Sequence, residues 1–228
     1  MIKLSQVAFA YKNKKVLKNI TINIPSGQIV GIIGENGSGK STLLKVMAGI
    51  VQSKSGSVLL NDQCVTRRMA DRIAFMPDTD LFYEYFTIEQ LLTFYNKQYE
   101  DFSVDKASKI LRELNIESNE QLRKLSKGQR GRVKLAATLG RNVPLYILDE
   151  PFSGLDPIIR DEVVRALIRH IDSETQAVIL STHEIHEVEP ILDQVVLLKD
   201  GHLKGIANLE ELREEYGYDA KQWMKTYN

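Results

Sequence analysis

The sequence predicts an α/β fold, in which a parallel β-sheet is covered by helices on both faces. Continuous apolar runs such as "QIVGIIG" and "QAVILST" alternate with helical segments such as "DPIIRDEVVRALIRHI", and strands that are apolar on both faces are typical of parallel sheets. A stretch with helical patterns only lies between them, at about 79–140. We therefore predict a single domain over residues 1–228, with a helical subdomain at about 79–140 inserted in the α/β core.

The chain up to Met76 has the patterns of β-strands. Turn residues such as Ser26-Gly27 and Ser55-Gly56 separate short runs rich in β-branched and apolar residues. These predicted strands are "KLSQVAFAY", "LKNITINIP", "QIVGIIG", "GSVLLND" and "RIAFM".

Helices are predicted after Pro77. Thr87 and Gln90 have the spacing of a capping box that opens a helix through "IEQLLTFYNKQY", and "SVDKASKILRELNI" and "SKGQRGRVKLAATLG" have apolar residues at helical spacing. Strands return at "PLYILDE" and "QAVILST". Asp200-Gly201 predicts a type I′ turn, so "VVLLKDGHLKGI" is expected to be a hairpin.

The composition limits the classes of function. Thirty basic residues balance thirty acidic residues, so no overall field favours nucleic acid or an anionic membrane. Cys64 is the only cysteine, which excludes an intrachain disulfide and a thiolate metal cluster and favours a reducing compartment. We expect neither a signal peptide nor a membrane span, because no apolar run approaches the length of about 20 residues that a span needs.

A glycine-rich loop predicts a phosphate-binding site. In "GIIGENGSGKST", Gly34 is followed after four residues by Gly39-Lys40-Ser41, between an apolar strand and a helix. The glycines let backbone N–H groups converge on phosphate oxygens at the helix N-terminus, while Ser41 can bind Mg²⁺ and Lys40 the terminal phosphates. The alternative is a chance match in a strand–helix turn. The residues expected to bind the nucleotide here are Asn36, Gly37, Gly39, Lys40, Ser41 and Thr42.

Two acids end the predicted strand "LYILDE". A Mg²⁺ beside a triphosphate needs a carboxylate nearby, and Asp149 is placed to supply it. Glu150 could hold the attacking water and act as general base. Without the phosphate loop, the alternative is that the two acids cap the turn that follows them.

The segment "LSKGQR" at 125–130, followed by "LYILDEP", "SGLD" and "STHE", resembles the ATP-binding cassette of ABC transporters, and the resemblance covers essentially the whole chain. It implies a P-loop NTPase core of the RecA type, an antiparallel β subdomain and an inserted α-helical subdomain. It also implies ATP and Mg²⁺ as cofactors and an ATPase activity.

The resemblance also implies roles for further residues. Tyr11 matches the aromatic residue that stacks on adenine, Ser126–Gln129 the signature, Ser153–Asp156 the loop that crosses the dimer interface, and His183 the switch histidine. In the family two cassettes pair head to tail, so that each ATP lies between one phosphate loop and the other chain's signature. Ser126, Gly128 and Gln129, at the predicted start of a helix, would form that second anion site.

Two residues depart from the family pattern. Lys127 occupies a signature position where glycine is common, so its side chain must point away from the phosphates or add a cation near them. Asp78, in "AFMPDTD", stands where a glutamine usually links metal and water to the membrane subunit. Its carboxylate could approach Mg²⁺ but donates no hydrogen bond. The alternative is that Asp78 merely starts a turn after Pro77.

Aromatic residues gather in the segment from Phe82 to Phe102, and "LFYEYF" among them is difficult to bury completely. Aromatic anchors are favoured at protein interfaces, and in the family this region receives a helix of the transmembrane subunit. We therefore predict "LFYEYF" as a docking surface, and Phe94 and Tyr95 as part of the helical core.

Other residues are given simpler interpretations. "HEIHE" at 183–187 lacks the H-E-x-x-H spacing, so we favour His183 as a γ-phosphate partner over a metal site. "KNKK" at 12–15 is interpreted as a solvated turn, and Cys64 as a small structural hydrophobic residue. Trp223 could dock on the core or on a neighbour.

The leading hypothesis is the ATPase subunit of an ABC transporter. Its partners would be a transmembrane subunit on a separate chain and a second, identical or related, ATPase subunit, with no nucleic acid. We expect the chain to lie in the cytoplasm, at the inner face of the cell membrane. By analogy with the cassettes of bacterial exporters, we expect the transporter to work in export. The alternatives are a soluble non-transport ABC ATPase, for example in cofactor assembly, and a small-molecule kinase, which would leave "LSKGQR" unexplained.

Overall fold

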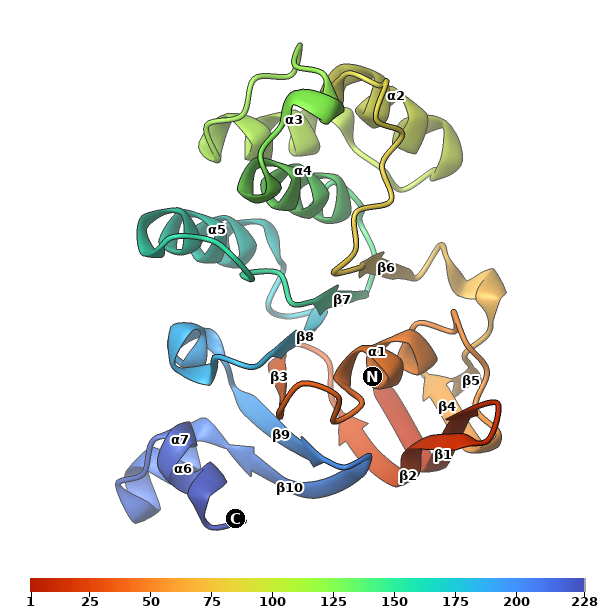
Figure 1. Ribbon diagram of the computed structural model, residues 1–228, viewed down its shortest axis with the longest axis vertical. Coiled ribbons are helices and arrows are strands. Elements are labelled where there is room, and N and C mark those ends of the chain that lie inside the picture. Colours follow the sequence, from red (N-terminus) through yellow and green to blue (C-terminus); the bar gives the residue numbers. More distant parts are fainter. Residues whose placement is uncertain (228) are drawn as a thin grey trace.

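The structure, a computed structural model, describes residues 1–227 and contains two β-sheets and a layer of helices (Figure 1). The first sheet is antiparallel, with the strand order β2-β1-β4-β5. Its strands are β1 (Ile2–Tyr11), β2 (Lys14–Ile24), β4 (Ser55–Leu60) and β5 (Gln63–Cys64).

The second sheet has six strands in the order β10-β9-β3-β8-β7-β6. All neighbouring pairs are parallel except β9 and β10, which form a hairpin. Asp200 and Gly201 connect that hairpin with φ angles of 51° and 76°, as a type I′ turn requires. The strands are β3 (Ile29–Ile33), β6 (Ile73–Met76), β7 (Leu145–Asp149), β8 (Ala177–Thr182), β9 (Gln194–Lys199) and β10 (His202–Asn208).

The helices begin where the sequence supplies caps. Thr87 and Gln90 form the predicted capping box at α2, Ser126 and Gln129 form a second one at α4, and Asp156 caps α5, with Pro157 in its first turn. The helices are α1 (Lys40–Met47), α2 (Ile88–Gln98), α3 (Val104–Glu113), α4 (Lys127–Leu139), α5 (Pro157–His170), α6 (Leu209–Tyr216) and α7 (Ala220–Lys225).

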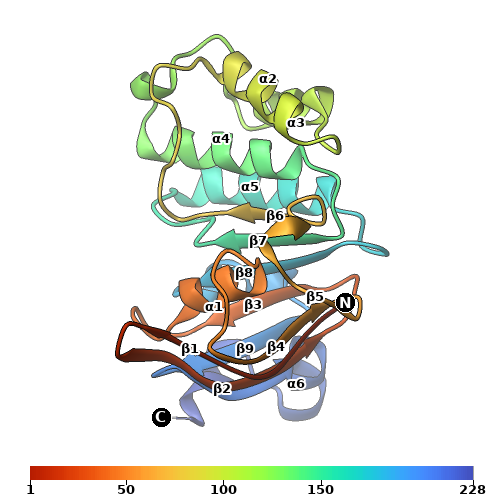
Figure 2. The same cartoon turned by 90° about the vertical axis from the view of Figure 1, so that its right-hand side faces the viewer.

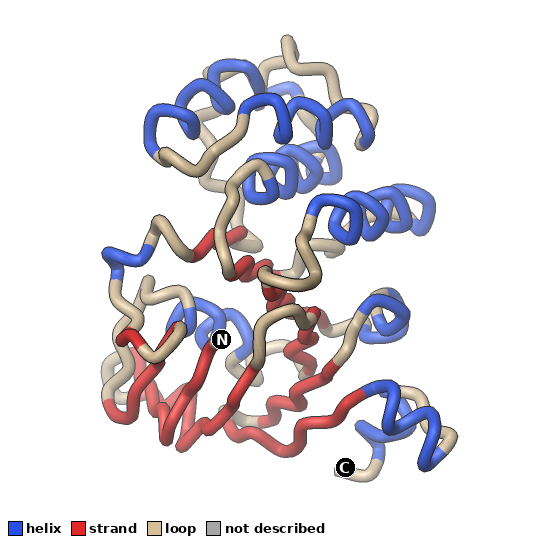
Figure 3. Tube along the Cα trace, turned by 180° about the vertical axis from the view of Figure 1, so that it is seen from behind, coloured by secondary structure: helices blue, strands red, loops and turns tan. Residues whose placement is uncertain are grey.

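The six-stranded sheet divides two hydrophobic cores. Leu145 and Ile147 of β7 face the core shared with α1 and the antiparallel sheet, whereas Tyr146 and Leu148 face the core shared with the helical layer. This alternation follows from the two-residue period of a strand, and it explains why the strand sequences are apolar throughout. Figures 2 and 3 show α2, α3 and α4 beyond the β6 edge of the sheet, with α4 in contact with β6 and with α5.

The predicted fold class is confirmed: antiparallel and parallel sheets and the predicted helices are all present. The helices α2, α3 and α4 lie between β6 and β7 in the chain, and the subdomain boundaries at about 79–140 stay a prediction.

The C-terminal helices α6 and α7 were not predicted. Asn208 caps α6 with its side chain, and α7 presents Trp223 to the core, with 8% of its surface exposed. Trp223 lies against β10, where a Cβ at Gly205 would be only 2.8 Å from the indole. The tail thus docks on its own chain. Among residues 1–227, none of the helices has the length and apolar character that a membrane crossing requires.

Candidate active site

The carboxyl ends of four parallel strands bring the predicted site residues together. Strand register aligns Ile33 of β3 with Thr182 of β8, Asp149 of β7 with Ser181 of β8, and Met76 of β6 with Leu148 of β7. The phosphate loop follows β3, Glu150 follows β7, His183 follows β8, and Asp78 follows β6. Segments far apart in the chain therefore meet at one edge, as is usual for ligand sites in α/β sheets.

The phosphate loop depends on its glycines. A Cβ at Gly34 would overlap the carbonyl oxygen of Leu198, and Gly39 precedes α1 with a φ angle of 110°, which side chains rarely tolerate. No side chain caps the N-terminus of α1. Its first N–H groups are therefore available to an anion, in the manner of phosphate sites at helix N-termini.

A cavity of about 520 Å³ opens at this loop. Predicted residues that line it are Tyr11, Asn36, Gly37, Gly39, Lys40, Ser41, Thr42, Asp78 and Glu150. It is also lined by residues that sequence reasoning missed: Lys14, Lys15, Val16, Lys18, Asp200 and Gly201. Tyr11 is 46% exposed and stands edge to face with Phe9.

Lys40 is held inside the loop. Its side chain is nearly buried, and Nζ donates hydrogen bonds to the carbonyl oxygens of Gly34 at 2.8 Å and Glu35 at 3.4 Å. Nζ also lies 3.5 Å from Oε1 of Glu150. A cation therefore stands between the phosphate loop and the acid that ends β7.

Asp149 is buried and is held by two hydroxyl groups. Ser41 Oγ donates to Oδ1 of Asp149 at 3.0 Å, and Ser181 Oγ donates to the same oxygen at 2.7 Å. Burial raises the pKa of Asp149, and the nearby carboxylates of Asp78 and Glu150 raise it further, while the two serine hydrogen bonds oppose the rise. The site thus concentrates negative charge in a place that is largely shielded from water.

These residues fit a magnesium ion. Ser41, Asp149 and Asp78 offer a hydroxyl and two carboxylates, and Mg²⁺ takes oxygen ligands of this kind together with phosphates and water. The charge of Asp78 contributes to the raised pKa of Asp149, so a divalent cation between these side chains would neutralise charge that the protein alone leaves unbalanced.

Glu150 has a constrained conformation. Its φ angle is 49°, in the left-handed region that glutamate rarely adopts. Its backbone N–H donates to Ser181 Oγ at 2.9 Å, and its Oε2 lies 2.9 Å from Nδ1 of His183. Because a carboxylate can only accept, Nδ1 of His183 carries the proton in this hydrogen bond. Lys40 and His183 therefore hold the two different oxygens of the Glu150 carboxylate.

The signature residues lie apart from this cavity. Ser126 and Gln129 bond to each other in the capping box at the N-terminus of α4, and neither these two residues nor Gly128 line the cavity at the phosphate loop. Within one chain the structure therefore brings together Tyr11, the phosphate loop, Asp78, Asp149, Glu150 and His183, but not the signature.

Lys127 points toward its own chain. A Cβ placed at Gly154 would lie 3.8 Å from Lys127 Nζ, so the ammonium group lies beside the loop Ser153–Asp156. Asp156 in that loop uses its carboxylate to cap α5, accepting from the N–H groups of Ile158 and Ile159.

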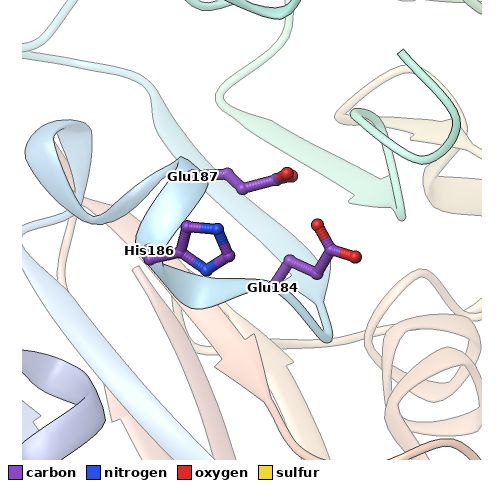
Figure 4. Close-up of side chains that lie close together, drawn as sticks. All are labelled: Glu184, His186 and Glu187. Atoms are coloured by element: carbon purple, nitrogen blue, oxygen red, sulfur yellow. The ribbon is translucent and has the colours of Figure 1, made fainter. Parts of the chain in front are cut away.

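The turn after β8 carries a cluster of titratable groups (Figure 4). Ligand atoms of Glu184, His186 and Glu187 lie within 4.8 Å of one another. Glu187, however, forms an ion pair with Arg160 of α5, and that guanidinium would compete with a metal ion. Burial, and next the hydrogen bond with Glu184, raise the pKa of Glu187 to about 7, although Arg160 opposes the shift.

The segment predicted for docking is largely exposed. Leu81, Tyr83 and Tyr85, which we call the aromatic patch, are 76%, 50% and 70% exposed. Phe82 and Tyr95 pack partly against the core. A second cavity, of about 610 Å³, lies beside the aromatic patch, between the helical layer and the sheet.

Ser181 is the main residue that sequence reasoning missed. Its hydroxyl group donates to the Asp149 carboxylate and accepts from the backbone N–H of Glu150. The available signal was its position at the end of an apolar strand, two residues before His183. The lysines of "KNKK" were interpreted as a solvated turn, yet Lys14 and Lys15 begin β2 and line the cavity. The interpretation of Cys64 as a structural hydrophobic residue is wrong, because its side chain is exposed on the short strand β5.

Comparisons with known proteins agree with this geometry. A family model described as "ABC transporter" matches residues 17–153. The chain is similar to the ABC transporter ATP-binding protein YtrB of Bacillus subtilis, with 28% identity over 95% of this chain and 75% of that protein. It is also similar to the lipopolysaccharide export system ATP-binding protein LptB of Escherichia coli, with 28% identity over 86% of each chain.

A solved structure described as the dimeric structure of MJ0796, a bacterial ABC transporter cassette, has the same fold. Its TM-score is 0.83 at 26% identity, and the match covers 92% of this chain and 99% of that one.

Proposed function

We propose a role in transport for this chain, which belongs to the ABC transporter family and is an ATP-binding, ATP-hydrolysing subunit. It would be one of two paired cassettes that drive a separate membrane-spanning protein. The two cassettes would be identical or closely related.

The observation that carries the pairing is the separation of two anion sites. The N-terminus of α1 lies at the cavity that contains Lys40, whereas Ser126 and Gly128 at the N-terminus of α4 do not line it. Head-to-tail pairing would bring the α4 N-terminus of each chain to the phosphates held by the other. That a cassette at 26% identity is described as dimeric supports pairing. ATP would then stabilise the closed pair, and hydrolysis would reopen it.

Glu150 is the proposed general base. Its carboxylate is oriented by Lys40 at 3.5 Å and His183 at 2.9 Å, and Ser181 fixes its backbone. It would take the proton of the attacking water, while Lys40 binds the terminal phosphates. His183, whose Nδ1–H is given to Glu150, would donate to the γ-phosphate through Nε2, a step that requires a proton on both ring nitrogens. Tyr11, exposed at the cavity edge, would stack on the base.

Ser41, Asp149 and Asp78 would hold Mg²⁺, which when bound supplies charge neutralisation at the phosphates. Asp78 brings a carboxylate to the cavity wall, so we expect a metal dependence that differs between Asp78→Gln, Asp78→Ala and the native chain. ATPase assays in Mg²⁺ and Mn²⁺ test this role, and identical activity and metal preference in all three proteins would contradict it.

The membrane partner would dock at the aromatic patch. Three large apolar side chains, Leu81, Tyr83 and Tyr85, are exposed there beside a cavity of about 610 Å³, and exposed aromatic groups of this kind are typical anchors of protein interfaces. The location that follows from this docking is the inner face of the cell membrane. We propose export as the direction, with support from the similarity to a protein named for lipopolysaccharide export.

Co-purification from membranes in detergent tests the transporter role. The native chain should bring down a membrane-spanning protein, and a variant with Tyr83→Ala and Tyr85→Ala should do so about tenfold less while binding ATP normally. The matched control replaces Tyr216 and Tyr218, exposed tyrosines at the end of α6 and two residues after it, and should co-purify like the native chain. Undiminished capture by the Tyr83/Tyr85 variant contradicts the docking surface. Capture of no membrane protein by the native chain contradicts the transporter role and favours a non-transport ATPase.

A further inference from the structure

Lys134, in the middle of α4, contacts the loop that leaves β6. Its Nζ donates hydrogen bonds to the carbonyl oxygens of Pro77 at 2.9 Å and Asp78 at 2.7 Å. Asp78 lines the same cavity as Lys40 and Glu150. A lysine on the signature helix therefore holds the backbone of a residue that lines the nucleotide site.

The loop needs such support because its strand has just ended. Met76 is the last residue of β6 paired with β7, opposite Leu148. Pro77 follows it and has no N–H with which to continue the ladder. The two hydrogen bonds from Lys134 restrain the backbone at this point, and they are bonds from a charged donor, which are stronger than neutral ones.

A second cation on the same face of α4 extends the restraint. Arg130, four residues before Lys134, forms an ion pair with Asp80 at 2.6 Å and approaches Glu84 at 3.8 Å. Asp80 in turn accepts a hydrogen bond from the backbone N–H of Phe82 at 3.0 Å. The loop is thus attached to α4 at two points, at Pro77 and Asp78 by Lys134 and at Asp80 by Arg130.

The surroundings of Lys134 are partly shielded from water. Burial lowers the pKa of Lys134, while the carboxylates of Asp78 and Asp80 oppose that shift. Of its two hydrogen bonds, the one to Pro77 is partly buried, whereas the one to Asp78 is exposed.

We propose that Lys134 is a positioning residue for ATP hydrolysis, which keeps the Asp78 carboxylate at the nucleotide and ties it to the helix that begins at Ser126. The inference rests on the role of Asp78 in the proposed function. This link predicts a coupled movement. When the N-terminus of α4 binds the nucleotide of a second chain, a shift of α4 also displaces Asp78, because Lys134 joins the two. The position of Asp78 in the nucleotide site would thereby depend on the pairing of the two chains, through the two hydrogen bonds of Lys134.

Three variants test the proposal. Lys134→Met keeps the length of the side chain and removes its donors, Lys134→Arg keeps donors, and Lys109→Met, at an exposed position of α3, is the matched control. Hydrogen–deuterium exchange of the segment 77–84 should be about fivefold faster in Lys134→Met and unchanged in Lys109→Met. The kcat of Lys134→Met should fall roughly 10- to 100-fold, because small displacements of a positioned group have effects of this size. Lys134→Arg should recover most of it.

A double substitution separates this inference from its premise. If Lys134 acts through Asp78, then Lys134→Met has no further effect on kcat in the Asp78→Ala background. Independent, multiplicative losses overturn the inference, as does unchanged exchange of segment 77–84 in Lys134→Met. If Asp78→Ala itself leaves hydrolysis and metal preference unchanged, the proposed role of Asp78 fails and the inference fails with it. If only Asp78→Ala has an effect, the inference about Lys134 alone is wrong. Should Lys134→Met not fold, Lys134→Leu, which also lacks a donor, is measured in its place with the same criteria.

Discussion

The nucleotide edge of the six-stranded sheet and the helical layer with its loop 77–86 are built differently. At the sheet edge, short side chains such as Ser181 and Asp149 are buried and bond across neighbouring strands, whose register fixes their positions. In the helical layer, long cations such as Arg130 and Lys134 reach out to the loop, and the aromatic patch stays exposed. The difference teaches that the geometry proposed for hydrolysis is part of the sheet, whereas the region proposed to meet other proteins is attached to the sheet by a few side-chain bonds.

The largest effect is expected at the sheet edge. Lys40→Met removes the cation that lies 3.5 Å from Glu150 inside the phosphate loop, and we expect ATP hydrolysis to fall by about 100- to 1,000-fold, the usual loss when one preorganised charge is removed. Steady-state phosphate release measures it. Lys54→Met, at an exposed position, is the control. A fall of less than tenfold would mean that the sheet edge does not carry the chemistry.

The next effect concerns the attachment of the helical layer. Arg141 is 4% exposed, bonds to both carboxylate oxygens of Asp101 and to the carbonyl oxygen of Ala70, and lies 3.7 Å over the ring of Tyr99. Arg141→Met should lower the free energy of unfolding by about 3 kcal/mol, because it breaks a buried ion pair. ATP affinity at the phosphate loop should change much less.

Urea unfolding and ATP titration measure the two quantities for Arg141→Met. The control Arg169→Met removes an ion pair to Glu113 at 3.4 Å from a side chain that is 62% exposed, and it should cost less than about 1 kcal/mol. Equal effects of the two substitutions would show that Arg141 is no special attachment point.

The smallest effect is a pH dependence at the turn after β8. The pKa of Glu187 is raised to about 7, above that of an ordinary glutamate, so the folded protein binds a proton that the unfolded chain has lost. The free energy of unfolding therefore falls as the pH rises from about 4.5 to about 7, and this contribution is constant above that range. Glu187→Gln should remove a slope on the order of 1 kcal/mol over this window. Unfolding in urea at pH 5 and pH 8 measures it, with Glu214→Gln at an exposed position as control. A slope that persists in Glu187→Gln would exclude Glu187 as its source.

The same contrast explains what could be predicted from the sequence. The strands, the phosphate loop, the capping box of Thr87 and Gln90 and the Asp200-Gly201 turn follow from local patterns, and the structure contains all of them. The link between Lys134 and Pro77 joins residues 57 positions apart, and no local pattern specifies it. Ser181 acquires its place only through the register of β7 and β8.

The C-terminal helices were missed for a related reason. The segment of α6 and α7 is polar, and its order depends on Trp223 meeting the flat surface that Gly205 leaves on β10. The aromatic segment was predicted more accurately, since its local composition already indicated incomplete burial. Tyr83 and Tyr85 are exposed, while Tyr95 packs partly against the core. Phe94, which was also predicted for the core, instead has its ring against those of Tyr83 and Phe86.

The central claim is that ATP joins two cassettes and that Glu150 is the base that ends the pairing. The most direct measurement is the mass of the Glu150→Gln variant with ATP, by light scattering after size exclusion, on the chain alone and on the complex isolated from membranes. We predict a stable pair with ATP and none without it. Adding Gly128→Asp should abolish the pair, because a Cβ at Gly128 meets only Leu155, at 3.6 Å, so the new carboxylate would repel the phosphates without disturbing the fold. If Glu150→Gln binds ATP but never pairs, while the native chain hydrolyses ATP normally, the account is contradicted.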